Sequence, residues 1–299
     1  MLRLAFLALA APLLLGVAAP GIDPLLLADD DFARHRDPDE WRGLSVEDVE
    51  FREDRVHWRL WRIVNGARPK GPLWLVPHDN ENGAFDAALV AVRAYGGTVV
   101  AVDSGVHPEH DGQRFNYAVE RGAPVDPNRN FDAAVPLYAA AVLGSWRPGD
   151  GPIIALHTNT RGFDTRLSNC NRSDAPGNGV ISIRYCDARY APHPSLARAF
   201  PFDDDDTLVF IPHALGTDPQ RAFCWQLWHY DFNLVEETVA VSDRSISNYA
   251  VPRGYDYLTL ETLDSGASAA ALAGQRDRLM AMIDHSFSAC VPQISRNPG

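Results

Sequence analysis

Two histidines and one glutamate have the residue types and the spacing to bind a single metal ion. His78 and Glu81 are three positions apart and directly follow the apolar run 73–76, and His157 directly follows a second run, 153–156. Two imidazoles and one carboxylate form a known zinc ligand set, and three protein ligands leave a fourth position for water, as in catalytic sites. The alternative is that His78 is a polar loop residue and His157 a hydrogen-bonded core histidine.

A second group of polar residues has the chemistry to bind a carboxylate. Asn128 and Arg129 lie within the stretch DPNRNFD, residues 126–132. A planar guanidinium matches a carboxylate with two parallel hydrogen bonds, and an adjacent amide adds a donor. The alternative is a structural ion pair between Arg129 and either Asp126 or Asp132.

Glu261 directly follows a third apolar run, 257–260. Polar side chains at the carboxyl ends of strands gather into sites in α/β sheets, so Glu261 is a further candidate site residue. The alternative is an ordinary surface carboxylate at a strand end.

Short apolar strands alternating with helices must position these residues, and this pattern is typical of an α/β fold. It predicts a single domain with a mixed, mostly parallel twisted sheet and helices on both faces. Sites in such sheets gather at the carboxyl ends of strands. Residues 20–50 are acidic, contain proline and are expected to be irregular. The expected strands are 56–64, 73–76, 98–102, 153–156, 180–183, 208–211 and 257–260, and the expected helices are 82–95, 133–143 and 268–290.

The composition is that of an ordinary globular protein with an acidic surface. The chain of 299 residues is 46% hydrophobic and 22% charged, and its formal net charge is -12. The hydrophobic fraction is too high for a disordered chain. The negative charge repels phosphate backbones and anionic lipids, so generic nucleic-acid binding and adhesion to such membranes are excluded as functions.

The N-terminus is typical of a secretory signal peptide. Residues 1–18 begin with a short region that carries Arg3, followed by an apolar run over 4–15 and small residues before the expected cleavage after Ala18. The run is too short to cross a membrane comfortably. We therefore expect an exported protein, periplasmic or secreted, whose mature domain is 19–299 and has no stable membrane anchor. The alternative is a retained anchor.

Four cysteines in an exported chain suggest two disulfides. Cys170 and Cys186 flank a loop that contains glycine, asparagine and proline, which favours the pairs Cys170–Cys186 and Cys224–Cys290. The chain has no CxxC spacing, so a zinc site built on cysteines is not expected. The alternative is four free buried thiols.

Four short motifs together resemble the zinc carboxypeptidases, the carboxypeptidase A-like superfamily. They are HxxE at 78–81, DPNRNFD at 126–132, LHTN at 156–159 and LTLE at 258–261, and they span about residues 72–264 in the order of that family. The resemblance is one of anchored motifs and not of continuous similarity. It implies a zinc carboxypeptidase-like fold.

The resemblance also implies a role for each candidate residue. His78, Glu81 and His157 correspond to the ligands of one Zn²⁺ ion. Glu261 corresponds to the general base, which activates water and then protonates the leaving amine.

Two further roles follow from the same resemblance. Asn128 and Arg129 correspond to the pair that holds the terminal carboxylate of the substrate. Either Arg114 or Arg121 corresponds to the arginine that polarises the scissile carbonyl.

The family usually has a mobile tyrosine that closes over the substrate, and its position is unassigned here. Tyr249, Tyr255 and Tyr257 lie near Glu261 in the sequence, but none of them matches the family position.

The motifs predict an exported zinc metallocarboxypeptidase that hydrolyses the amide bond next to a free C-terminal carboxylate of a peptide. One alternative is a zinc-dependent N-acyl amino acid deacylase, because HDNE at 78–81 resembles HGNE of the aspartoacylase and succinylglutamate desuccinylase relatives. A further alternative is a non-catalytic peptide-binding module on a degenerate peptidase scaffold. The intact ligand set and base argue against such a module.

Overall fold

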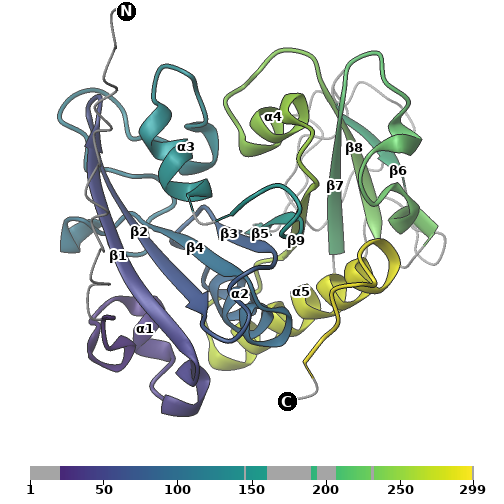
Figure 1. Cartoon of the computed structure of the whole chain (residues 1–299). Helices are drawn as coiled ribbons and strands as arrows, with labels where there is room; N and C mark the ends of the chain where they lie inside the picture. The colour runs from purple at the N-terminus through teal and green to yellow at the C-terminus, as the bar shows by residue number, and fades with distance from the viewer. Residues whose placement is uncertain (1–20, 145, 160–189, 194–206, 230–231, 298–299) are drawn as a thin grey trace, which may run out of the picture.

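The computed structural model describes residues 21–144, 146–159, 190–193, 207–229 and 232–297 (Figure 1). The expected signal peptide at 1–18, the expected strand at 180–183 and the expected pair Cys170–Cys186 lie outside these residues.

The described strands form one nine-stranded sheet in the order β1-β2-β4-β3-β5-β9-β7-β8-β6. Pairing is parallel between β3 and β4, β3 and β5, β5 and β9, and β7 and β8, and antiparallel elsewhere. The strands are β1 (Leu44–Glu53), β2 (Val56–Asn65), β3 (Leu73–Val76), β4 (Thr98–Asp103), β5 (Ile153–Asn159), β6 (Tyr190–His193), β7 (Thr207–Ala214), β8 (Asn233–Val239) and β9 (Tyr257–Leu263).

Successive side chains of a strand point to opposite faces of the sheet, so the apolar strands make both faces apolar. Helices cover both of these faces. Trp74 of β3 packs in the core cluster that also contains residues of α2 and α5, whereas Leu73 and Leu75 pack in the cluster with α3 and α4. Figure 1 shows α2 and α5 below the sheet and α3 and α4 above it. The prediction of an α/β fold with a mixed sheet between two helical layers is confirmed. The helices are α1 (Asp30–Arg34), α2 (Asn82–Tyr95), α3 (Pro136–Leu143), α4 (Ile246–Ala250) and α5 (Ala269–Cys290).

The strongly patterned elements lie where the sequence predicts them. The strand at 73–76 and the helix at 82–95 have the predicted bounds, and the closing helix begins one residue later than expected. Strands β5 and β9 continue three residues beyond their apolar runs. Those extra residues carry the polar side chains of the candidate site, so each apolar run marks only the part of its strand that is buried in the core.

The prediction that residues 20–50 are irregular is wrong. Strand β1 pairs with β2 in antiparallel register from Leu44, opposite Asn65, to Glu53, opposite Val56. It is an edge strand in which half of the side chains are charged and the apolar residues alternate with polar ones only in part, so its apolar pattern is weak. The segment before it buries Phe32 and Trp41 in the same core as α2.

The predicted disulfide Cys224–Cys290 is confirmed. Its Cα atoms are 5.3 Å apart, and the bond joins the segment before β8 to the last residue of α5. Among the residues that the structure describes, no helix is both long and apolar enough to cross a bilayer.

Candidate metal centre

Three buried side chains converge at the carboxyl ends of β3 and β5. His78 and Glu81 come from the turn between β3 and α2, and His157 comes from the end of β5. His78 Nδ1 lies 2.7 Å from Glu81 Oε1, and His157 Nδ1 lies 2.9 Å from Glu81 Oε2. One ligand atom from each residue lies within 4.8 Å of the others, so the three can bind one ion together.

Hydrogen bonds from neighbouring groups hold this triad in a defined orientation. Asp126 Oδ1 lies 3.0 Å from His78 Nε2, on the side of the ring away from Glu81. The backbone amide of Thr158 donates to Glu81 Oε2 at 3.0 Å. His157 Nε2 is buried and has no hydrogen-bond partner among the described residues. Two imidazole nitrogens facing one carboxylate in a buried site fit a metal such as zinc.

Electrostatics keep the carboxylate of this triad charged. Burial acts to raise the pKa of Glu81, but the neighbouring His78 and His157 outweigh burial and hold the pKa well below the ordinary value. Burial acts to lower the pKa of His78, but Glu81 and Asp126 outweigh it and raise that pKa. Protons therefore compete with a metal ion for His78 more strongly than they would at an isolated imidazole.

Glu261 lies beside the triad on the neighbouring strand. In the parallel pairing of β5 with β9, Glu261 is opposite His157, so the two side chains are on the same face of the sheet. Asn159 Nδ2 donates to Glu261 Oε2 at 3.1 Å. No role was predicted for Asn159, although it is the last residue of LHTN at 156–159; it lies two residues beyond His157 and orients the Glu261 carboxylate.

Arg114, and not Arg121, reaches the triad. Its Nη1 atom donates to Glu81 Oε1 at 2.7 Å, and its side chain is 42% exposed. Arg121 is exposed, and its backbone carbonyl accepts a hydrogen bond from Arg55 at 2.8 Å. The sequence spacing left both arginines open, and the structure shows a contact with the triad for Arg114.

Asn128 and Arg129 lie next to the triad through one shared carboxylate. Asp126 Oδ2 accepts from Arg129 Nη1 at 3.0 Å, while the other oxygen of Asp126 contacts His78. Arg129 also forms an ion pair with Asp243 at 3.6 Å, and its side chain is 48% exposed. Asn128 Oδ1 is buried with no hydrogen-bond partner among the described residues. The Arg129–Asp126 pair that the sequence allowed is present, and the Arg129 side chain is half-exposed.

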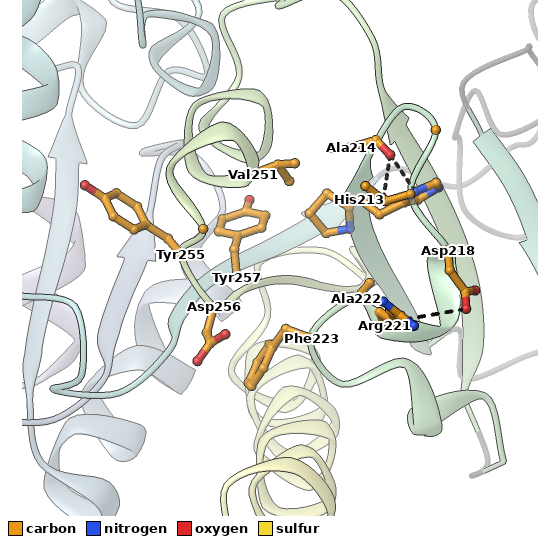
Figure 2. A pocket seen from close by; sticks show the side chains of 14 residues that line it. His213, Ala214, Asp218, Arg221, Ala222, Phe223, Val251, Tyr255, Asp256 and Tyr257 are labelled. Atoms are coloured by element: carbon orange, nitrogen blue, oxygen red, sulfur yellow. Dashed lines mark hydrogen bonds and ion pairs between the residues drawn. The ribbon is translucent and has the colours of Figure 1, made fainter.

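Two of the three tyrosines close to Glu261 in the sequence line a separate pocket. Figure 2 shows this pocket of about 600 Å³, which Tyr255 and Tyr257 line together with His213 from the far end of β7. Because β7 runs antiparallel to β9, these residues lie towards the start of β9, away from Glu261. Tyr249 instead packs its ring against Phe131, 5.7 Å away. None of these contacts brings one of the three tyrosines to the triad.

Acidic side chains gather around the end of β4. The carboxylate oxygens of Asp29, Asp103 and Asp111 lie within 4.8 Å of one another. Asp103 is buried, accepts a hydrogen bond from the amide of Gly105 at 2.7 Å and lies 3.4 Å from Arg59. Burial, and next the charge of Asp29, raise the pKa of Asp103 to about 7.

We expect Asp103 to make the protein less stable as the pH rises. Its pKa is higher in the folded state than in the unfolded chain, where it is about 3.9, so its stabilising contribution is complete below pH 4 and is lost as the pH rises through about 7. Asp103→Asn removes this dependence and keeps an acceptor for Gly105. From pH 5 to pH 8 the parent should lose about 2–3 kcal/mol of its free energy of unfolding relative to the variant.

Urea denaturation at the two pH values measures this difference. The exposed Asp277→Asn is the matched control, because its side chain is 68% exposed. An equal change for both variants would contradict the role given to burial.

Comparisons with known proteins give structural likenesses only. No protein-family model and no curated protein matches this chain. A protein of Shewanella denitrificans described as a proposed metallopeptidase has a TM-score of 0.44 and 14% identity, over 88% of this chain and 90% of that chain. A similarly described protein of Shewanella amazonensis has a TM-score of 0.43 and 13% identity, over 86% and 90%. A succinylglutamate desuccinylase/aspartoacylase of Rhodobacter sphaeroides has a TM-score of 0.42 and 13% identity, over 86% and 67%.

The descriptions of these structures belong to the two groups that the sequence motifs resemble, metallopeptidases and desuccinylases. All three TM-scores are below 0.5, so we draw no functional conclusion from the likeness. A function for this chain has to be derived from the residues of its site.

Proposed function

We propose that this chain is a metal-dependent hydrolase, an exported zinc carboxypeptidase that cleaves the amide bond next to a free C-terminal carboxylate. The observation that carries the proposal is the buried triad of His78, Glu81 and His157 with Glu261 opposite His157 on the adjacent strand. A ligand set of this kind beside a carboxylate that is not a ligand is the arrangement that metal-assisted hydrolysis requires.

In this proposal the side chains around the triad have different roles in amide hydrolysis. A bound zinc ion supplies a Lewis acid and lowers the pKa of water. Glu261, oriented by Asn159, takes a proton from the attacking water and delivers it to the leaving amine. Arg114 donates to the oxygen on which negative charge develops.

The remaining pair sets which bond is cleaved. Asn128 and Arg129 hold the terminal carboxylate of the substrate. Arg129 is tied through Asp126 to His78, so the bound carboxylate lies at a fixed distance from the triad. Only the amide bond next to the last residue then reaches the reacting groups.

A panel of substrates with and without a chelator tests the proposal. Purified protein is incubated with peptides and N-acyl amino acids, and the products are identified by mass spectrometry. Chelator-sensitive release of single C-terminal residues is the expected result. Cleavage confined to N-acyl amino acids would replace the peptidase by the deacylase, whereas the absence of both cleavage and bound zinc would favour the binding module.

We expect Arg129→Ala to weaken binding of substrates that have a free carboxylate. A hydrogen bond to a charged group contributes about 1.5–3 kcal/mol, so KM should rise roughly 10- to 100-fold, while the KM for the matching C-terminal amides changes little. Initial rates on peptide acids and amides measure this difference. Arg244→Ala is the control, because Arg244 is an exposed arginine nearby that pairs with Asp132 instead. Equal effects of Arg129→Ala on acids and amides would remove the carboxylate role.

Export is part of the same proposal. The apolar N-terminal run and the Cys224–Cys290 disulfide both support it, since disulfides persist in oxidising compartments. We expect the mature protein recovered outside the cytoplasm to begin at Ala19, which N-terminal sequencing would show. A mature protein that still begins at Met1 would contradict cleavage.

A further inference from the structure

We propose that Asp79 is a positioning residue that holds the loop after β4 so that Arg114 reaches the metal centre. This inference rests on the proposed function, because it explains how one residue of that mechanism is placed. Asp79 lies between His78 and Glu81 in the sequence and is buried, with 3% of its surface exposed. The carboxylate of Asp79 is absent from the triad itself.

One oxygen of Asp79 ties together the two ends of this loop. Asp79 Oδ2 accepts from the backbone amide of Ser104 at 3.0 Å, where the chain leaves β4, and from the amide of Gly112 at 3.1 Å. Gly112 has φ 67°, a left-handed conformation that glycine adopts without strain. The loop of residues 104–112 therefore begins and ends on the same carboxylate oxygen.

The same carboxylate also reaches the backbone next to Arg114. The Ser104 hydroxyl lies 2.8 Å from Asp79 Oδ2 and is also within hydrogen-bonding distance of the carbonyl of Gln113. The hydroxyl has one proton and donates to only one of these two acceptors, so the bond from the Gly112 amide is the one that fixes the residues before Arg114 relative to the turn that carries His78 and Glu81.

This arrangement matters because the Arg114 side chain is long and partly exposed. Arg114 contacts the triad through one hydrogen bond of 2.7 Å, to Glu81. Ordering a long side chain for that bond costs conformational entropy. A backbone fixed to the turn that supplies two ligands lowers this cost, since it sets the distance from Arg114 to the triad. Loss of the Asp79 carboxylate should release the loop and leave the three ligands in place.

The test compares Asp79→Ala with Arg114→Ala, the double variant and the conservative Asp79→Asn, which keeps an acceptor oxygen. Ser104→Ala removes only the hydroxyl contact and serves if Asp79→Ala folds poorly. Glu109→Ala is the matched control, because it removes an exposed carboxylate from the same loop. Each zinc-loaded protein is measured for bound zinc, kcat and KM, for hydrogen exchange over residues 104–116, and for labelling of Arg114 by phenylglyoxal.

For Asp79→Ala we expect unchanged zinc content, faster exchange over residues 104–116, faster labelling of Arg114 and a fall in kcat of about 10- to 100-fold. The double variant should be no slower than Arg114→Ala, while Asp79→Asn should restore most of the protection and most of kcat. Arg114→Ala alone should leave the exchange slow, because Asp79 still holds the loop.

Three results would overturn the inference: unchanged exchange and labelling in Asp79→Ala, effects on kcat that add in the double variant, or loss of zinc from Asp79→Ala. Exchange and labelling do not depend on turnover. If the parent protein hydrolyses no substrate, the proposed function fails, while these two measurements still decide whether Asp79 places Arg114.

Discussion

Replacing Glu261 by glutamine is expected to leave zinc binding intact and to lower kcat by about a thousandfold. Glu261 is not one of the three converging ligands, so its loss should not change the metal content. Glutamine keeps the shape of the side chain and can still accept from Asn159, but it cannot take a proton from water. A positioned general base contributes about 10²- to 10⁴-fold to a rate, which sets the size of the expected loss.

Zinc content and kcat measured on the same sample separate binding from chemistry. Glu236→Gln is the control, because Glu236 is a partly buried glutamate on β8 whose carboxylate contacts His213 at 2.9 Å and not the triad. Substantial turnover by Glu261→Gln would contradict the assignment of Glu261 as the general base. Loss of zinc would instead make Glu261 part of the metal site.

Replacing His157 by alanine is expected to abolish both zinc binding and hydrolysis. His157 supplies one of two nitrogen ligands, and the pair that remains, His78 with Glu81, comes from a single turn. Two ligands bind zinc far more weakly than three, so we expect zinc to fall from one ion per chain to a trace after gel filtration. Turnover should fall by at least about a thousandfold.

The matched control for this variant is His213→Ala. His213 is also a buried histidine at the end of a strand, and its Nε2 atom lies 2.9 Å from the Glu236 carboxylate. Metal analysis by mass spectrometry, with circular dichroism to confirm folding, should give one zinc per chain for the control. One zinc ion retained by folded His157→Ala would show that the metal binds elsewhere.

The site residues whose positions could be predicted best from the sequence are those at the ends of strands. His157 and Glu261 each follow an apolar run, and the parallel pairing of their strands places them opposite each other. A parallel sheet lines up the carboxyl ends of its strands, so the apolar runs indicate that both residues lie at the same edge of the sheet. Helix α2 could be predicted equally well, because its apolar residues recur at helical spacing.

The contacts that depend on loops could not be read in the same way. The contact of Arg114 with Glu81 depends on the path of the chain after β4, where the amides of Ser104 and Gly112 donate to Asp79. The double role of Asp126, which contacts both His78 and Arg129, also depends on tertiary structure. Helix α4 has only five residues, and such a short segment gives no periodic signal.

The way in which the sheet gathers these ligands has a consequence for how the protein folds. His157 and its partner Glu81 are 76 residues apart in the chain, and Asn159 and Glu261 are 102 apart. Such contacts close large loops, which is entropically costly, so they form late and require the central strands to be paired already. The unfolded chain does not hold His157 near His78 and Glu81, so it lacks the complete triad. Zinc should therefore bind the native state selectively, so that the free concentration of the ion in the surrounding compartment acts as a thermodynamic control on how much of the chain is folded.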